Sequence, residues 1–107
     1  MNGSNFVMKL QCDQQSIRLR LDELEYQQLI KNRAVNYPIE YLNLELQLQI
    51  VADEIPSQYQ ETQLNVFLTQ LQAEQLNTDT QRKHGINLWL ETKTHNVLLT
   101  VQLDLHK

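Results

Sequence analysis

The sequence predicts an α+β domain: a mainly antiparallel sheet, either strongly curved or partly closed into a barrel, with two short helices. Three observations lead to this fold class. Apolar and polar residues alternate along most of the chain, two helix-capping patterns interrupt the alternation, and the order strand, helix, strand occurs twice. A chain of 107 residues can bury one hydrophobic core, so we expect a single domain over residues 1–107.

The clearest strand is the segment YLNLELQLQIV, residues 41–51, in which leucine or isoleucine occupies every second position from Leu42 to Ile50. In a strand, this alternation places the aliphatic side chains on one face and polar side chains on the other. A sheet with one face in water is typical of antiparallel pairing. A doubly wound parallel sheet is therefore not expected.

The same period of two predicts further strands, giving at least six in all. These segments are residues 6–12, 17–21, 64–68, 86–90 and 97–103. Thr94-His95-Asn96 separates the last two, so residues 86–104 should form a hairpin, and residues 13–15 should turn the first two strands in the same way.

Two segments break the alternation and predict short helices. In LDELEYQQLIKN, Asp22 is followed three residues later by Glu25, and in LTQLQAEQLN, Thr69 is followed by Gln72. A side chain at the N-cap and a Glu or Gln three residues later satisfy each other's backbone N–H groups. Both helices should therefore begin directly at the end of a strand.

The chain also predicts an internal repeat. A shift of 47 positions places IRLRLDELEYQQL, residues 17–29, over LNVFLTQLQAEQL, residues 64–76. Strand end, cap, helix and following strands occur in the same order in both segments. We expect a duplicated unit of strand, helix and strand at about residues 16–51 and 63–105, related by an approximate two-fold axis.

Composition and charge limit the class of protein. Hydrophobic residues make up 41% of the chain and charged residues 21%, which are ordinary globular values. The net charge of −4 argues against binding of nucleic acid through an overall positive field. No apolar run is long enough for a signal peptide or a membrane span, and Cys12 is the single cysteine. These features predict a soluble cytoplasmic protein with a disordered end at residues 1–5, and Met8 could equally be the natural first residue.

Arg18 and Arg20 lie two positions apart, so both should project from the polar face of one strand. Two guanidinium groups on one surface could hold a carboxylate or a phosphate. The alternative, which we favour, is that they pair with Glu45 or another carboxylate across the sheet.

Phe67 and Trp89 occupy the polar phase of their strands, which places two aromatic rings on a face of polar residues. Such a patch could bind a partner or stack on bases. The alternative, again favoured, is that the two helices pack on this face and cover both rings.

We predict no metal site, no cofactor and no catalytic residue. His84, His95 and His106 are spaced eleven residues apart but should lie before a strand, in a hairpin loop and at the chain end. Zinc ligands must converge within bonding distance, which this placement does not favour. Cys12 reads as a small packed residue.

One motif has a counterpart in a known family. The segment SIRLRL, Ser16–Leu21, runs into a capped helix, and Met8 is followed by Lys9 and an apolar residue. From Met8 onward the chain resembles a family of short bacterial proteins classed only as a domain of unknown function. The resemblance covers residues 8–103 and implies fold and a cytoplasmic bacterial origin, with no activity. Relatives end in a Lys-Asp-aromatic-x-Cys segment, whereas this chain ends QLDLHK.

Two functions follow as hypotheses. The first is a non-enzymatic interaction or binding module, with a protein partner or a second copy on an exposed strand or on the surface around Phe67 and Trp89. The second is a small-anion or nucleotide site at Arg18 and Arg20, with or without catalysis. We expect no membrane partner.

Overall fold

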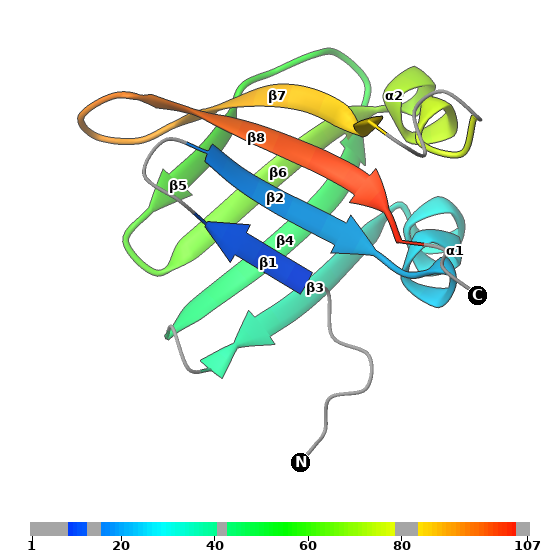
Figure 1. Cartoon of the computed structure of the whole chain (residues 1–107), viewed down its shortest axis with the longest axis horizontal. Coiled ribbons are helices and arrows are strands. Elements are labelled where there is room, and N and C mark those ends of the chain that lie inside the picture. Colours follow the sequence, from blue (N-terminus) through cyan, green and yellow to red (C-terminus); the bar gives the residue numbers. More distant parts are fainter. Residues whose placement is uncertain (1–8, 13–15, 41–42, 79–83, 105–107) are drawn as a thin grey trace.

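The computed structural model describes residues 9–12, 16–40, 43–78 and 84–104, which form one eight-stranded sheet and two helices (Figure 1). The strands are β1 Lys9–Cys12, β2 Ser16–Leu21, β3 Ala34–Ile39, β4 Leu44–Val51, β5 Ser57–Gln60, β6 Gln63–Thr69, β7 Ile86–Glu91 and β8 Asn96–Leu103. The helices are α1 Glu23–Asn32 and α2 Gln70–Gln75.

The sheet is mixed, so the expectation of a mainly antiparallel sheet was wrong. Its strand order is β1-β2-β8-β7-β5-β6-β4-β3. Strands β2 and β8, β4 and β6, and β5 and β7 pair in parallel, while the other four pairings are antiparallel. The expectation took one-sided burial as a mark of antiparallel pairing. Here the sheet curls, so parallel strands too have one face in the core and one outside.

The curl brings two parts of the sheet face to face. Strands β1, β2 and β8 cross in front of β3, β4 and β6 (Figure 1). The sheet ends at β1 and β3, and β3 contains Pro38, a residue that sheets accept at an edge. The curved form of the sheet was expected. Eight strands are present where at least six were predicted, and β3 and β5 are the additions.

The alternation predicted from the sequence decides which side chains form the core. On β4 the buried residues are Leu46, Leu48 and Ile50, and the residues between them are half-buried. The inward residues of the other strands join them in one cluster. That cluster is Leu19, Leu21, Leu29, Val35, Ile39, Leu46, Leu48, Ile50, Leu64, Val66, Leu68, Ala73, Leu76, Ile86, Leu90, Leu99, Val101 and Leu103.

Both helices begin at the predicted capping boxes. The Asp22 side chain accepts a hydrogen bond from the backbone N–H of Glu25, and the Glu25 side chain accepts one from the N–H of Asp22. Thr69 and Gln72 make the same reciprocal pair at α2. Because Leu29, Ala73 and Leu76 lie in the core cluster, the helices close one end of the curled sheet.

With β5 left aside, the elements after β1 follow one order twice. We call β2, α1, β3 and β4 the first half, and β6, α2, β7 and β8 the second half. In each half a capped helix leads into an antiparallel hairpin, which includes the predicted hairpin of residues 86–104. The last strand of each half pairs in parallel with the first strand of the other. The turn expected at residues 13–15 lies outside the described residues.

Candidate functional site

The outer surface of β2, β8 and β7 carries most of the residues that the sequence singled out. The register places Arg18 opposite Thr100, and Thr100 opposite Asn87. In the next outward row, Ser16 is opposite Leu98, and Leu98 is opposite Trp89. We call the outward side of these three strands the Trp89 face.

Arg18 and Arg20 alternate along β2 with the buried Leu19 and Leu21, so both arginines point outward. The Nη1 of Arg18 donates a hydrogen bond of 2.7 Å to Oε1 of Gln102 on β8. Glu45, the partner favoured from the sequence, lies on β4, and four strands separate β4 from β2. Among the residues that the structure describes, neither arginine has a carboxylate partner, so the predicted ion pair with Glu45 is wrong.

Trp89 is the largest exposed ring on this surface, with 60% of its side chain open to solvent. Phe67 is half-buried on β6, and β5 lies between β6 and β7. The helices stand at the end of the sheet and not over its outer surface, so the expectation that they cover both rings was wrong for Trp89.

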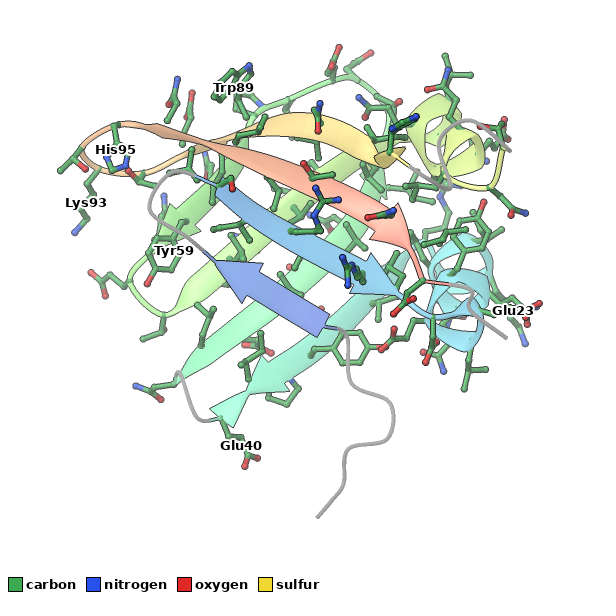
Figure 2. All side chains as sticks on the ribbon, in the orientation of Figure 1. Glu23, Glu40, Tyr59, Trp89, Lys93 and His95 are labelled. Atoms are coloured by element: carbon green, nitrogen blue, oxygen red, sulfur yellow. The ribbon has the colours of Figure 1, made fainter. Side chains whose placement is uncertain are left out.

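A second site lies at the end of the sheet away from the helices, where the β5–β6 and β7–β8 turns meet. Two adjoining hollows of about 460 and 410 Å³ open there, and we call them together the mouth hollow. Tyr59, Lys93 and His95 lie at this end of the molecule (Figure 2). The lining residues are Gln58, Tyr59, Gln60, Glu61, Thr62, Gln63, Glu91, Thr92, Lys93, Thr94 and His95.

Hydrogen bonds fix the turn that forms one wall of the mouth hollow. The backbone N–H and the hydroxyl of Thr92 both donate to the carbonyl of His95, at 3.0 and 2.7 Å. The N–H groups of Thr94 and His95 donate to the Thr92 hydroxyl. This local network holds Lys93 at the tip of a defined turn.

The titratable groups with shifted pKa values lie elsewhere, at the helix end of the sheet. Glu25 is 3% exposed, and its Oε2 has no hydrogen-bond partner in the part of the chain that the structure describes. Burial raises the pKa of Glu25, although the hydrogen bond from the Asp22 backbone opposes this. Burial and the neighbouring Glu25 raise the pKa of Tyr37. Glu25 belongs to the helix cap, and Tyr37 packs against the core from β3.

Within the described ranges, no three metal-ligating side chains come together. His84 is separated from the start of β7 by Gly85, and His95 lies in the turn after β7, so the two are at opposite ends of that strand. His106 and the side chain of Cys12 lie outside what the structure describes.

Sequence reasoning found the two arginines and the exposed tryptophan, but it missed the mouth hollow. Tyr59 comes from β5 and Glu61 from the turn after it, and Lys93 comes from another turn about thirty residues later in the chain. No motif links the two turns. Only the pairing of β5 with β7 brings them together.

The fold and both sites can now be set against known proteins. The family model described as a family of unknown function (DUF7009) matches residues 8–106. The chain belongs to this family. The predicted resemblance to an uncharacterised domain-of-unknown-function family is therefore confirmed. Comparisons with curated proteins and with solved structures found no match. Within the described residues, neither helix is long and apolar enough to cross a membrane.

Proposed function

We propose that this DUF7009 protein is a non-enzymatic binding module whose partner surface is the Trp89 face. The observation that carries the proposal is the exposed indole of Trp89 in the middle of a sheet strand. Tryptophan and arginine are enriched among the residues that dominate binding energy at protein interfaces. Trp89, Arg18 and Arg20 all lie on this one surface.

The chemistry of the surface favours a protein partner with acidic residues around an apolar anchor. The ring of Trp89 and the half-buried Leu98 supply the apolar part. Arg18 and Arg20 supply positive charge that no described carboxylate neutralises. Charge complementarity of this kind steers association and excludes wrong partners.

A site-specific cross-linking experiment tests this proposal. A photoreactive amino acid at position 89 should trap a partner protein in cells, whereas the same group at Pro38, the exposed position in the equivalent row of the first half, should not. With the trapped protein purified, Trp89→Ala should weaken binding about thirtyfold, the effect of a typical hot-spot residue. Equal yields at positions 89 and 38 would rule the surface out. A trapped second copy would make the module a homodimer, which light scattering would confirm.

A second candidate function is the binding of a small anion or a nucleotide by Arg18 and Arg20. The lack of a described carboxylate partner for either guanidinium favours it. Phosphorylated metabolites should then raise the melting temperature of the wild type but not of the Arg18→Gln/Arg20→Gln variant. Arg33→Gln is the matched control, because Arg33 is exposed at the end of α1 and also bonds a glutamine, Gln70. A response that survives in the double variant excludes this site.

We further propose that residues of about 16–51 and 63–105 are an internal repeat. Leu24 and Leu71 hold the same place in the two helices and are 61% and 62% exposed, which supports the repeat. A chain in which residues 24–29 are replaced by residues 71–76 should still fold, whereas the same graft shifted by one position should not. Similar loss of folding in both chains would argue against the repeat.

The proposed place of action is the bacterial cytoplasm. A single cysteine suits a reducing compartment, where thiols stay reduced. Fractionation of bacterial cells that express the natural protein should recover it with cytoplasmic markers, and recovery with periplasmic markers would refute this assignment.

A further inference from the structure

The mouth hollow combines groups that suit a small charged ligand. Its two parts share Tyr59, Glu61, Thr92 and Lys93, and they are open surface hollows of about 460 and 410 Å³. The hollow lies at the turns of β5–β6 and β7–β8, so it does not depend on the Trp89 face.

Charges of both signs surround this hollow without neutralising one another. Glu61 and Glu91 contribute carboxylates, Lys93 contributes an ammonium group and His95 an imidazole. In the described part of the chain, none of these four groups forms an ion pair. A ligand that carries both charges could therefore replace water at both kinds of group.

Tyr59 adds a third element of recognition. Its side chain is 40% exposed and lines both parts of the hollow together with Glu61. The face of an aromatic ring attracts ammonium groups, and a nearby carboxylate strengthens that attraction. On the other wall, the hydrogen bonds of Thr92 hold the turn that presents Lys93. Such preorganisation lowers the entropic cost of binding.

We propose that the mouth hollow binds a small zwitterion of the amino-acid class. The ligand's ammonium group lies at Tyr59 and Glu61, with Glu91 adding negative charge, and its carboxylate lies at Lys93 and His95. The wall of glutamine and threonine side chains offers hydrogen bonds to an amide or hydroxyl group between the two charges.

Calorimetric titration of the full chain with a series of ω-amino acids, from glycine to 6-aminohexanoic acid, tests the proposal. Each titration is repeated with butylamine and with butyrate, which carry one of the two charges. One chain length should bind best, and both single-charge probes should bind at least about tenfold more weakly, because a charge-assisted hydrogen bond is lost in each. Comparable binding of butylamine would make the hollow a cation site and overturn the proposal.

Three variants locate the site. Lys93→Gln should weaken binding of the best ω-amino acid about tenfold and leave butylamine unaffected, whereas Glu61→Gln should weaken both. Glu40→Gln is the control, since Glu40 is an exposed carboxylate at another edge of the sheet (Figure 2), and it should change nothing. The proposal fails if no member of the series binds saturably, or if Lys93→Gln and Glu40→Gln behave alike.

Discussion

The two halves of the molecule are alike inside and different outside. In one inward row Leu19, Val101 and Ile86 lie side by side on β2, β8 and β7. The matching row on β6, β4 and β3 holds Val66, Leu48 and Val35, and all six side chains are buried aliphatics. The close-packed core accepts only apolar side chains that fill its space, so the inward rows of both halves hold residues of the same kind.

The outward rows show no such constraint. The row Ser16, Leu98 and Trp89 corresponds in place to Gln63, Glu45 and Pro38. One row ends on an exposed indole, and its counterpart ends on a proline at the edge of the sheet. The two halves therefore share the apolar pattern of their inward rows and differ in the side chains of these outward rows.

Substitutions of buried leucines in the two halves should have the largest effects on stability, and they test whether the two inward rows are alike. Leu21 and Leu68 are fully buried at the ends of β2 and β6, so Leu21→Ala and Leu68→Ala should each lower the free energy of unfolding by about 2–5 kcal/mol in urea titrations. The exposed pair Leu24→Ala and Leu71→Ala should each cost under about 0.5 kcal/mol. A cost below about 1 kcal/mol for one buried leucine, with a large cost for the other, would show that the halves do not share one core.

Gly85 marks a place where the halves differ in backbone. It precedes β7 with φ +78°, and a Cβ there would lie 2.7 Å from Cγ2 of Thr100 and 2.8 Å from the carbonyl oxygen of Val101. Gly85→Ala should therefore lower the free energy of unfolding by about 2 kcal/mol, which a lower melting temperature would report. Ala34→Gly, at the start of the matching strand β3, should cost only about 0.5–1 kcal/mol. Equal losses would mean that the backbone before β7 is not strained.

The two capping boxes differ in both residues, Asp22 and Glu25 in the first and Thr69 and Gln72 in the second, and they should differ in their response to pH. Burial raises the pKa of Glu25 above its ordinary value of 4.5, so the folded state holds this proton more tightly than the unfolded state. The stabilisation that comes from protonated Glu25 is complete below pH 4.5 and is lost as the pH rises through the pKa of Glu25 in the folded state. Glu25→Gln removes this loss. At pH 7 we expect the free energy of unfolding to rise by about 1 kcal/mol, and this gain should disappear near pH 4.

The reverse change at the second box is the control. Gln72 donates a hydrogen bond of 3.4 Å to Oε2 of Glu54, so Gln72→Glu would place two carboxylates together and should lower the free energy of unfolding at pH 7. Urea titrations at pH 4 and pH 7 measure both variants. A gain from Glu25→Gln that is the same at both values would mean that the carboxyl group of Glu25 is not the cause.

The smallest expected effect concerns the contact between the helices. The hydroxyl of Tyr26 on α1 donates a 2.9 Å hydrogen bond to the carbonyl oxygen of Ala73 on α2. Tyr26→Phe should lower the free energy of unfolding by about 1 kcal/mol, since the ring stays and one hydrogen bond is lost. Tyr59→Phe, which alters an exposed ring, should have no measurable effect. A null result for Tyr26→Phe would show that the helices are held by apolar contacts alone.

Local patterns predicted local structure well. The alternation of leucine fixed which side chains of β4 are buried, and the capping residues Asp22 and Thr69 marked where both helices begin. Strand β3 escaped notice because Pro38 and Asn36 weaken its pattern, and β5 because it has four residues. The pairing direction could not be read, since alternation records which face is buried and carries no information about the neighbouring strand.

The candidate sites differ in the same way, because some depend on local sequence patterns and others on tertiary structure. Trp89 stood out because an aromatic side chain in the polar phase of a strand is a local anomaly. Arg18 and Arg20 stood out because they lie two positions apart on the polar face of one strand, but their neighbours, Thr100 and Gln102, depended on the parallel pairing of β2 with β8. The mouth hollow needs two turns to meet, which only the tertiary structure decides.

The pairing of β2 with β8 has a consequence for how the protein is made. Ser16 is opposite Leu98, so β2 must wait for its neighbour until β8 has been synthesised and has left the ribosome. Until then, the edge of β2 that pairs with β8 has no neighbouring strand, and its buried-face leucines lack the side chains of β8 beside them. Contacts between residues so far apart in the sequence form slowly. Nascent chains halted before β8 should thus be the species that chaperones and proteases encounter.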